Sequence, residues 1–235
     1  KVATGATAVR VNKAGFGTYK FANYDELIDC PFEMGVFWSG QFLAHGIQHR
    51  FVVAGASSTI DGARLLADTK KICETEIEFW HGKTGAKQQK PPFKNYVFLL
   101  NVVAEGGGGL EHRNSTALLC KRDDLPRLGE VKQTNGYAGL LGLISHEYFH
   151  TWNVKRLHPA DFSEFDYSQE NYTEMLWFFE GFTSYYDDLL LRRSGLIDDA
   201  QYLEVLCKTV NHVWQTPGRK VQSVAQASFD AWIKY

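Results

Sequence analysis

Short apolar runs separated by glycine and polar turns dominate the first half of the chain. Residues 1–20 alternate weakly between apolar and polar positions, and residues 32–56 are rich in β-branched and aromatic side chains. Both patterns predict strands, with two or three of them in the second segment. The almost continuous apolar run 96–103 predicts a buried strand, and residues 115–120 predict another.

One helix is predicted between the strands, and in the second half of the chain the apolar residues follow helical spacing. Helices are predicted for five segments: about 61–80, 136–154, 174–193, 198–214 and 220–233. Asp198 has a side chain suited to cap the fourth of them. The polar segments 82–92 and 121–135 predict loops. Strands first and helices later predict a fold of the α+β class.

Composition and charge exclude several function classes. The chain has 25 basic and 27 acidic residues, for a net charge of −2, and no basic cluster indicates nucleic-acid binding. No apolar run has membrane-spanning length and no signal peptide is visible, although a start without Met leaves room for a removed leader. Nothing indicates the oligomeric state.

The cysteines are dispersed, without a close-spaced pair that would indicate a zinc cluster or a disulfide framework. They are Cys30, Cys73, Cys120 and Cys207. This spacing predicts buried thiols in a reducing compartment, and hence a cytoplasmic protein.

The pentad His146-Glu147-Tyr148-Phe149-His150 carries the most specific chemical signal. Residues four apart lie on one helix face, so His146 and His150 can direct their imidazoles at one ion. Glu147 can reach the same side and take a proton from water there. The flanking residues are apolar or aromatic, which predicts a buried helix. Because buried polar groups need partners, a bound Zn²⁺ explains the motif better than a surface turn does.

A catalytic zinc site needs a third protein ligand, and an aromatic stretch downstream supplies one. Glu180 is the one charged residue between Leu176 and Tyr186. A carboxylate in such surroundings is expected to be paired or bound to metal. Glu174 is the alternative ligand. The chain is therefore predicted to be a zinc-dependent hydrolase.

A run of four glycines precedes Leu110, Glu111 and His112. Consecutive glycines cost backbone entropy and are kept where the chain needs unusual dihedral angles or close approach by another backbone. A glycine-rich turn entering a strand beside a metal site could pair with an extended peptide. A flexible surface loop is the alternative. A phosphate-binding loop is not indicated, because no Gly-Lys-Ser/Thr follows.

These motifs together resemble a known family. Residues 146–156 and 177–187 are similar to the glycyl aminopeptidase family, metallopeptidases of the gluzincin clan related to aminopeptidase N. Residues 24–31 and 216–224 also resemble that family, so the resemblance runs over most of the chain.

The resemblance implies a role for the glycine-rich segment. In aminopeptidases of this clan, a Gly-x-x-Glu-Asn-like segment precedes the HExxH helix, and its Glu holds the free α-amine of the substrate. Gly108, Gly109 and Glu111 match that segment as substrate-binding residues, with His112 where the aminopeptidase N family has Asn. Another departure is His158, where members commonly have Arg. An anionic anchor pairs with an α-ammonium and not with an internal amide, which favours an exopeptidase. A solvated loop carboxylate is the alternative role for Glu111.

The resemblance also implies the architecture. Residues 57–235 are expected to form a thermolysin-like zinc metallopeptidase catalytic domain, and residues 1–56 part of a preceding β-rich domain. The chain is expected to be incomplete at both ends, because family members continue into a Tyr-x-Lys-Gly-like segment, whose Tyr stabilises the oxyanion, and a PDZ-like domain. Tyr235 does not match that motif.

The predicted function is a zinc-dependent aminopeptidase that acts on peptides with a free N-terminus, after a small first residue such as Gly or Ala. In this prediction His146, His150 and Glu180 hold Zn²⁺, and Glu147 is the general base. Two alternatives stay open: a zinc endopeptidase of the same clan, and a truncated metal-binding fragment with little turnover.

Overall fold

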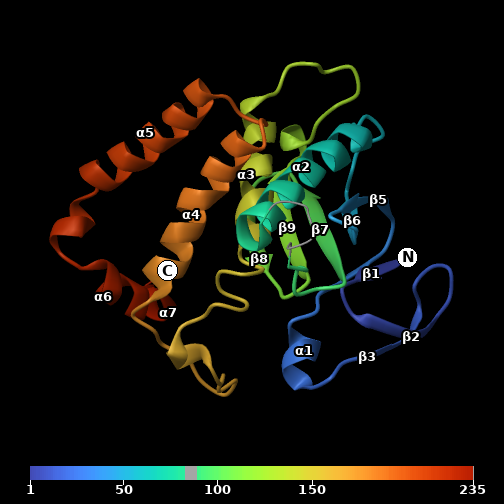
Figure 1. The fold of residues 1–235 in the computed structure, drawn as a ribbon, viewed down its shortest axis with the longest axis horizontal. Coiled ribbons are helices and arrows are strands. Elements are labelled where there is room, and N and C mark those ends of the chain that lie inside the picture. Colours follow the sequence, from blue (N-terminus) through green and yellow to red (C-terminus); the bar gives the residue numbers. More distant parts are fainter. Residues whose placement is uncertain (83–88, 235) are drawn as a thin grey trace.

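The computed structural model describes residues 1–82 and 89–234, and a five-stranded mixed sheet lies at its centre (Figure 1). Its strands lie in the order β5 (Phe37–Ala44), β6 (Ile47–Ala54), β7 (Asn95–Val103), β9 (Ser115–Lys121) and β8 (Gly108–Glu111). The three central strands run parallel, and the two edge strands pair antiparallel with their neighbours. The mixed α and β content agrees with the sequence prediction.

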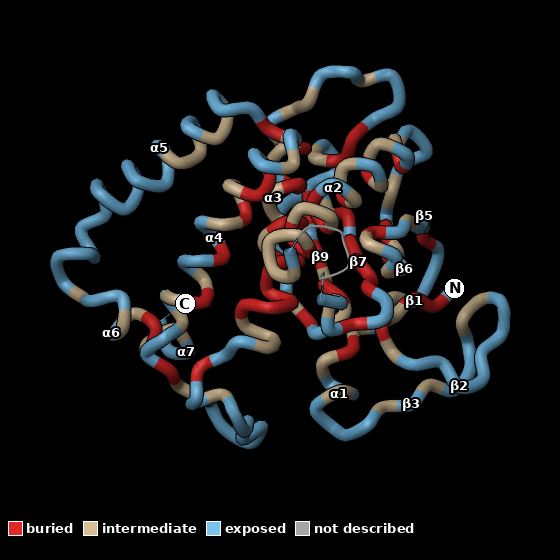
Figure 2. The backbone as a smooth tube through the Cα atoms, viewed as in Figure 1, coloured by how far each residue is buried: buried red, intermediate tan, exposed pale blue. Residues whose placement is uncertain are grey.

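Both faces of the middle strand β7 are covered, which explains its continuous apolar run. All residues from 96 to 100 are buried. Alternate side chains of this run join α2 (Gly62–His81) and α3 (Asn135–Phe149) in the main core, and the others pack with β1 (Val2–Thr4). Figure 2 shows this buried centre in red. A strand buried on two faces does not alternate, because a polar side chain would lose water on either face.

The strands on the two sides of residue 56, the expected domain boundary, belong to one sheet. Before β5, the chain forms two small antiparallel pairs and a short helix: β1 with β4 (Phe32–Met34), β2 (Thr7–Val11) with β3 (Gly17–Lys20), and α1 (Tyr24–Ile28). Within the described residues, these are the strands that pair outside the central sheet. We therefore propose that the β-rich N-terminal portion ends near residue 36.

Helix α3 is buried around most of its surface, as predicted, but it ends at Phe149 and does not reach residue 154. The backbone N–H groups of Trp152 and Asn153 both donate to the carbonyl oxygen of Phe149. These bonds close a tight turn directly after the helix, and they replace the hydrogen bonds that a longer helix would make.

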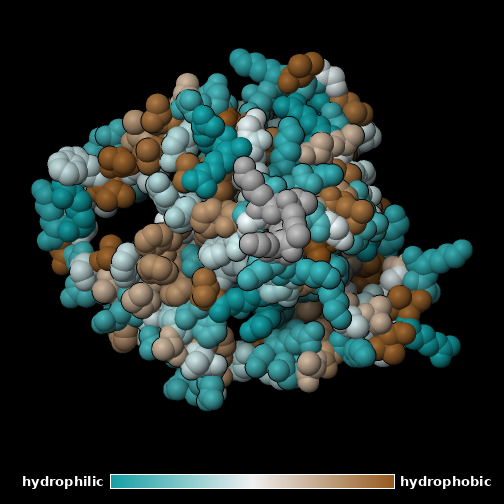
Figure 3. Space-filling view, viewed as in Figure 1, coloured by the Kyte–Doolittle hydropathy of each residue, from teal (hydrophilic) through white to brown (hydrophobic). Residues whose placement is uncertain are grey.

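The C-terminal part is helical, with α4 (Leu176–Arg193) packed on α3 and α5 (Asp199–Gln215) at the outer edge (Figure 1). No residue of α5 is buried, and Figure 3 shows apolar side chains on its surface. Cys207 on α5 is therefore exposed, against the prediction of four buried thiols. Cys30, Cys73 and Cys120 are buried.

The single helix predicted over 220–233 is wrong. The chain instead forms a 3₁₀ turn at Pro217–Lys220, then α6 (Val224–Phe229) and α7 (Ala231–Lys234). The Ser223 side chain accepts from the backbone N–H of Gln226, whose own side chain bonds back to the Ser223 backbone. This capping box begins a new helix at that point.

The two predicted loops are described in part. Residues 83–88 of the first loop lie outside the described residues, as does Tyr235. The second loop contains one 3₁₀ turn, Arg122–Asp124, and a third such turn lies at Ala160–Phe162. None of the described helices is both long and apolar enough to cross a membrane.

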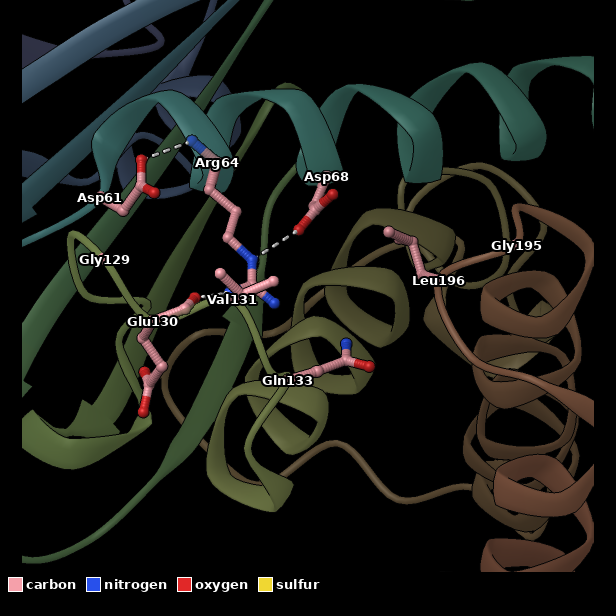
Figure 4. A pocket seen from close by; sticks show the side chains of 9 residues that line it. All are labelled: Asp61, Arg64, Asp68, Gly129, Glu130, Val131, Gln133, Gly195 and Leu196. Atoms are coloured by element: carbon pink, nitrogen blue, oxygen red, sulfur yellow. Dashed lines mark hydrogen bonds and ion pairs between the residues drawn. The ribbon is translucent and has the colours of Figure 1, made fainter.

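A shallow polar pocket lies where α2 begins, beside the loop that leads to α3 (Figure 4). Arg64 crosses it: its guanidinium donates to the carbonyl oxygen of Glu130 at 2.7 Å and lies 3.7 Å from the Asp68 carboxylate. The same guanidinium lies over the Tyr137 ring. These contacts tie α2 to the start of α3, which gives the pocket a structural role.

A buried histidine connects the sheet to α3. His49 on β6 donates from Nδ1 to the carbonyl oxygen of Ile47 at 2.9 Å, so its Nε2 accepts from the Tyr148 hydroxyl at 2.9 Å. Burial lowers the pKa of His49 to about 4, although the bond to Ile47 acts in the opposite direction. The folded protein therefore holds this imidazole neutral.

This burial predicts a pH dependence of stability. The unfolded chain restores the pKa of His49 to its ordinary value of 6.5, so below that value the unfolded state takes up the proton first and stability falls. His49→Gln keeps an acceptor for Tyr148 but does not titrate. Between pH 7 and pH 4 its free energy of unfolding should fall by about 3 kcal/mol less than that of the parent. Urea titrations at both pH values measure this, and equal losses would contradict it.

Candidate metal centre

Helix α3 places the pentad residues beside α4. Thr134 caps the start of α3, and His146 and Glu147 lie in its last turn. His150 is the C-cap residue and keeps helical backbone angles, with φ −59° and ψ −17°. The i, i+4 geometry of the two histidines therefore persists although the helix ends one residue before the second.

Three potential ligand atoms converge between α3 and α4. The Nε2 of His146 lies 3.0 Å from the Nε2 of His150. These two atoms lie 3.4 and 3.5 Å from Oε2 of Glu180. A tetrahedral Zn²⁺ with ordinary bond lengths separates its ligand atoms by about 3.3 Å. Among the described residues, these three form the group that could hold a metal ion; the alternative ligand Glu174 is exposed and outside it.

The Nδ1 atoms of both histidines already make hydrogen bonds within the protein. His146 donates from Nδ1 to Oδ2 of Asp187 at 2.8 Å, and His150 donates from Nδ1 to the carbonyl oxygen of Asn153 at 2.7 Å. In the neutral tautomers that carry their proton on Nδ1, each Nε2 presents a lone pair to the other and to the Glu180 carboxylate. Three acceptors this close need a shared cation, so the residues fit Zn²⁺ by their chemistry as well as by their spacing.

Without such a cation, protons balance the charge of the group. Burial lowers the pKa of His146, but the hydrogen bonds that it donates to Asp187 and Glu180 outweigh burial and raise the pKa to about 10. Burial raises the pKa of Glu180, but the bonds from the two histidines lower it to about 2. The carboxylates of Asp187 and Glu180 therefore favour a positive charge between α3 and α4.

Glu147 lies beside the metal ligands and against the sheet edge. It is buried, and burial raises its pKa to about 7, with the nearby histidines acting in the opposite direction. A Cβ built on Gly109 of β8 would lie 2.2 Å from Oε1 of Glu147. The β8 backbone therefore approaches the carboxylate closely because a glycine stands there.

The glycine run provides the turn that leads into this strand. Gly106 and Gly108 have φ values of +111° and +144°, which L side chains rarely adopt. Glu111 is half-buried at the end of β8. Its charge contributes to the pKa shifts of both Glu147 and His150, so it lies within electrostatic reach of the metal group.

The sequence reasoning missed the residues that orient the ligands. Asp187 lies two helical turns after Glu180, so it shares a face of α4 with the ligand, and this spacing could have indicated it. Asn153 donates to the carbonyl oxygen of Phe179 and to the Thr183 hydroxyl. It thereby ties the turn after α3 to α4, and no local pattern indicates that contact.

Comparisons with known proteins identify the family. Two family profiles match: M61 glycyl aminopeptidase over residues 139–235, and the peptidase M61 N-terminal domain over residues 1–36. Together they match more than half of the chain. The chain belongs to the M61 glycyl aminopeptidase family. The first profile contains the three residues of the metal group, and the family resemblance predicted from the sequence is confirmed.

A solved crystal structure supports the fold. The crystal structure of the aminopeptidase N family protein from Idiomarina loihiensis is 45% identical, with a TM-score of 0.93 over 99% of this M61 chain. The match covers 38% of the length of that protein. A two-domain M1 zinc metallopeptidase bound to L-tryptophan, 13% identical, has a TM-score of 0.50 over 92% of this chain and 42% of its own. A comparison with curated protein sequences found no match.

The orientation of His146 predicts a test of the M61 metal group. Asp187→Asn removes the carboxylate that receives the His146 Nδ1–H, and such a loss should weaken zinc binding about 10- to 100-fold. Competition with a zinc-binding dye measures the affinity. Asp188→Asn is the matched control, because Asp188 is adjacent on α4 and makes no direct bond to His146 among the described contacts. Equal zinc affinities for the Asp187 variant and the parent would remove this role.

Proposed function

We propose that this protein is a zinc-dependent aminopeptidase that releases a small N-terminal residue, Gly or Ala, from peptides. The observation that carries the proposal is the meeting of three groups. The candidate metal ligands, the buried Glu147 and the strand β8 with Glu111 lie together at the β8 edge of the sheet. We also propose that the fold is of the thermolysin-like type. Membership of the M61 family and the M1 zinc metallopeptidase neighbour support both proposals.

His146, His150 and Glu180 would hold the metal. Zn²⁺ bound there supplies a Lewis acid that polarises a carbonyl and makes water more acidic. The hydrogen bonds that the imidazoles donate to Asp187 and to the Asn153 carbonyl keep both rings turned toward the metal. The protein thus provides a ligand set whose orientation is established before the metal arrives.

Glu147 would move the proton. Its pKa of about 7 lies near the working pH of a neutral enzyme, so the carboxylate can accept a proton from water and later give it to the leaving amine. It makes contact with the β8 backbone at Gly109. A substrate lying along β8 would therefore have its scissile bond beside this carboxylate.

Strand β8 would bind the substrate backbone. It is an edge strand whose ladder partner is β9, and it packs beside α3. An extended peptide can add to such an edge through main-chain hydrogen bonds, with Gly108 and Gly109 allowing close approach. Glu111, at the end of the strand, would pair with the α-ammonium and so restrict cleavage to chain ends. The preference for a small first residue rests on the family description.

An endopeptidase of the same clan is the second candidate, since an edge strand would pair equally well with an internal segment. Glu111 distinguishes the two functions, because its carboxylate can pair with the free α-ammonium of a substrate but not with an internal amide. Hydrolysis of glycyl p-nitroanilide but not of its N-acetyl derivative is the result expected for the aminopeptidase. Preference for the blocked substrate would establish the endopeptidase.

The contact between β8 and the general base predicts a graded effect of two glycine substitutions. Gly109→Ala should displace the Glu147 carboxylate and lower kcat by at least about tenfold, because misplacement by 1 Å can cost ~10² in rate. Zinc content should not change. Gly107→Ala is the matched control: the nearest atom to its Cβ would be the Leu119 carbonyl oxygen, at 3.7 Å. Steady-state kinetics would contradict the assignment if both variants behaved alike.

The proton-transfer role predicts that Glu147→Gln keeps zinc and loses turnover. The amide has nearly the same shape but cannot accept a proton from water, so kcat should fall by about 10²- to 10⁴-fold. Elemental analysis and hydrolysis of glycyl p-nitroanilide measure the two properties. Turnover near the parent level would show that another group acts as the base.

A further inference from the structure

The chain segment just beyond Glu111 is held by the N-terminal portion of the molecule. Residues 112–114, here called the anchor turn, connect β8 to β9. The Asn114 side chain donates to the carbonyl oxygen of Gly5 at 2.9 Å. The backbone N–H of Arg113 donates to Oδ2 of Asp29 at 2.8 Å. The strand that carries Glu111 therefore ends in a turn whose position is set by residues far away in sequence.

Asp29 connects three separate segments. It is the C-cap residue of α1, so it lies in the N-terminal portion. Besides the Arg113 backbone, its carboxylate accepts from Nδ1 of His112 at 3.3 Å and from Nζ of Lys155 at 2.6 Å. Lys155 follows the metal ligand His150 by five residues, and its backbone N–H donates to the His150 carbonyl oxygen. One carboxylate thus joins α1, the anchor turn and the turn after the metal helix.

The contacts of Asp29 are partly shielded from water, so they contribute more stability than exposed ion pairs do. The side chains of Asp29 and His112 are 15% and 10% exposed, and that of Lys155 is 24% exposed. Burial raises the pKa of Asp29, but the bonds from His112 and Lys155 outweigh it and lower the pKa, so the carboxylate stays charged. Without the Asp29 carboxylate, its partly buried donors would lose their charged acceptor and stay unsatisfied. Removal of this carboxylate should therefore loosen the anchor turn.

We propose that Asp29 is a positioning residue for the amine anchor: it holds the anchor turn against the turn after α3 and so sets the distance between Glu111 and the metal group. The N-terminal portion then takes part in substrate binding without touching substrate. This inference rests on the proposed function of Glu111 as the amine anchor. It also explains why a strand rich in glycine can keep a carboxylate in place.

The test compares two zinc-binding probes that differ by one amino group. Glycine hydroxamate has the α-amine that Glu111 would bind, and acetohydroxamate lacks it. Calorimetry on the zinc-loaded chain gives the ratio of their dissociation constants, which measures the anchor apart from turnover. The parent should prefer glycine hydroxamate by about 10- to 100-fold. Asp29→Asn should reduce this preference to within about threefold, with the acetohydroxamate affinity and zinc content unchanged.

Two further variants make the result specific. Asp25→Asn is the matched control, since Asp25 lies on the same helix and bonds to Tyr167 and not to the anchor turn; it should keep the parent preference. Glu111→Gln should abolish the preference, and the double variant with Asp29→Asn should lose nothing more. A purely structural role would weaken both probes alike and leave their ratio unchanged.

The outcomes separate the two proposals. If Glu111→Gln abolishes the preference and Asp29→Asn preserves it, the positioning role is overturned and the amine anchor stands. If Glu111→Gln leaves the preference intact, the anchor is overturned and the positioning role with it. If Asp29→Asn does not fold, Asp29→Glu takes its place. It keeps the charge but shifts the carboxylate, and it should lose an intermediate part of the preference, whereas an unchanged ratio would overturn the inference.

Discussion

Two imidazole nitrogens and a carboxylate oxygen, mutually 3.0–3.5 Å apart, are the constraint on which the rest of this structure depends. All three are acceptors when His146 and His150 are the neutral tautomers that donate from Nδ1 to their partners. Their closeness is favourable with a cation between them and costly without one. Helices α3 and α4 are held together across this group, and the turn after α3 bonds to both of them.

The second constraint is the approach of a strand edge to a helix. Glu147 projects from α3 against β8, where a side chain in place of Gly109 would collide with it. The edge strand β8 is the part of the sheet that lies against Glu147, so we propose that a substrate binds there. The proposed general base, the proposed backbone-binding edge and the proposed amine anchor thus come from two elements that pack together. The contacts of Asp29 connect this arrangement to the N-terminal portion.

The sequence predicts the parts of this site that depend on local spacing. His146, Glu147 and His150 are related by helical geometry, and Glu180 is marked as the lone charge in an aromatic stretch. Asp187 and Asp29 act on partners 41 and 83 residues away, and such contacts arise only when the helices and the N-terminal portion have packed. The same limit applies to α5, whose apolar spacing predicts a helix but cannot show that none of its residues is buried.

Zinc content, measured on the purified chain and on two carboxylate variants, tests the central claim most directly. The parent and Glu174→Ala should each hold about one Zn²⁺ per chain, since Glu174 lies outside the ligand group. Glu180→Ala should lose the metal after dialysis, because two histidines alone leave the site a ligand short. Equal and stable zinc content in all three proteins would contradict the three-ligand site, and with it the catalytic account built on it.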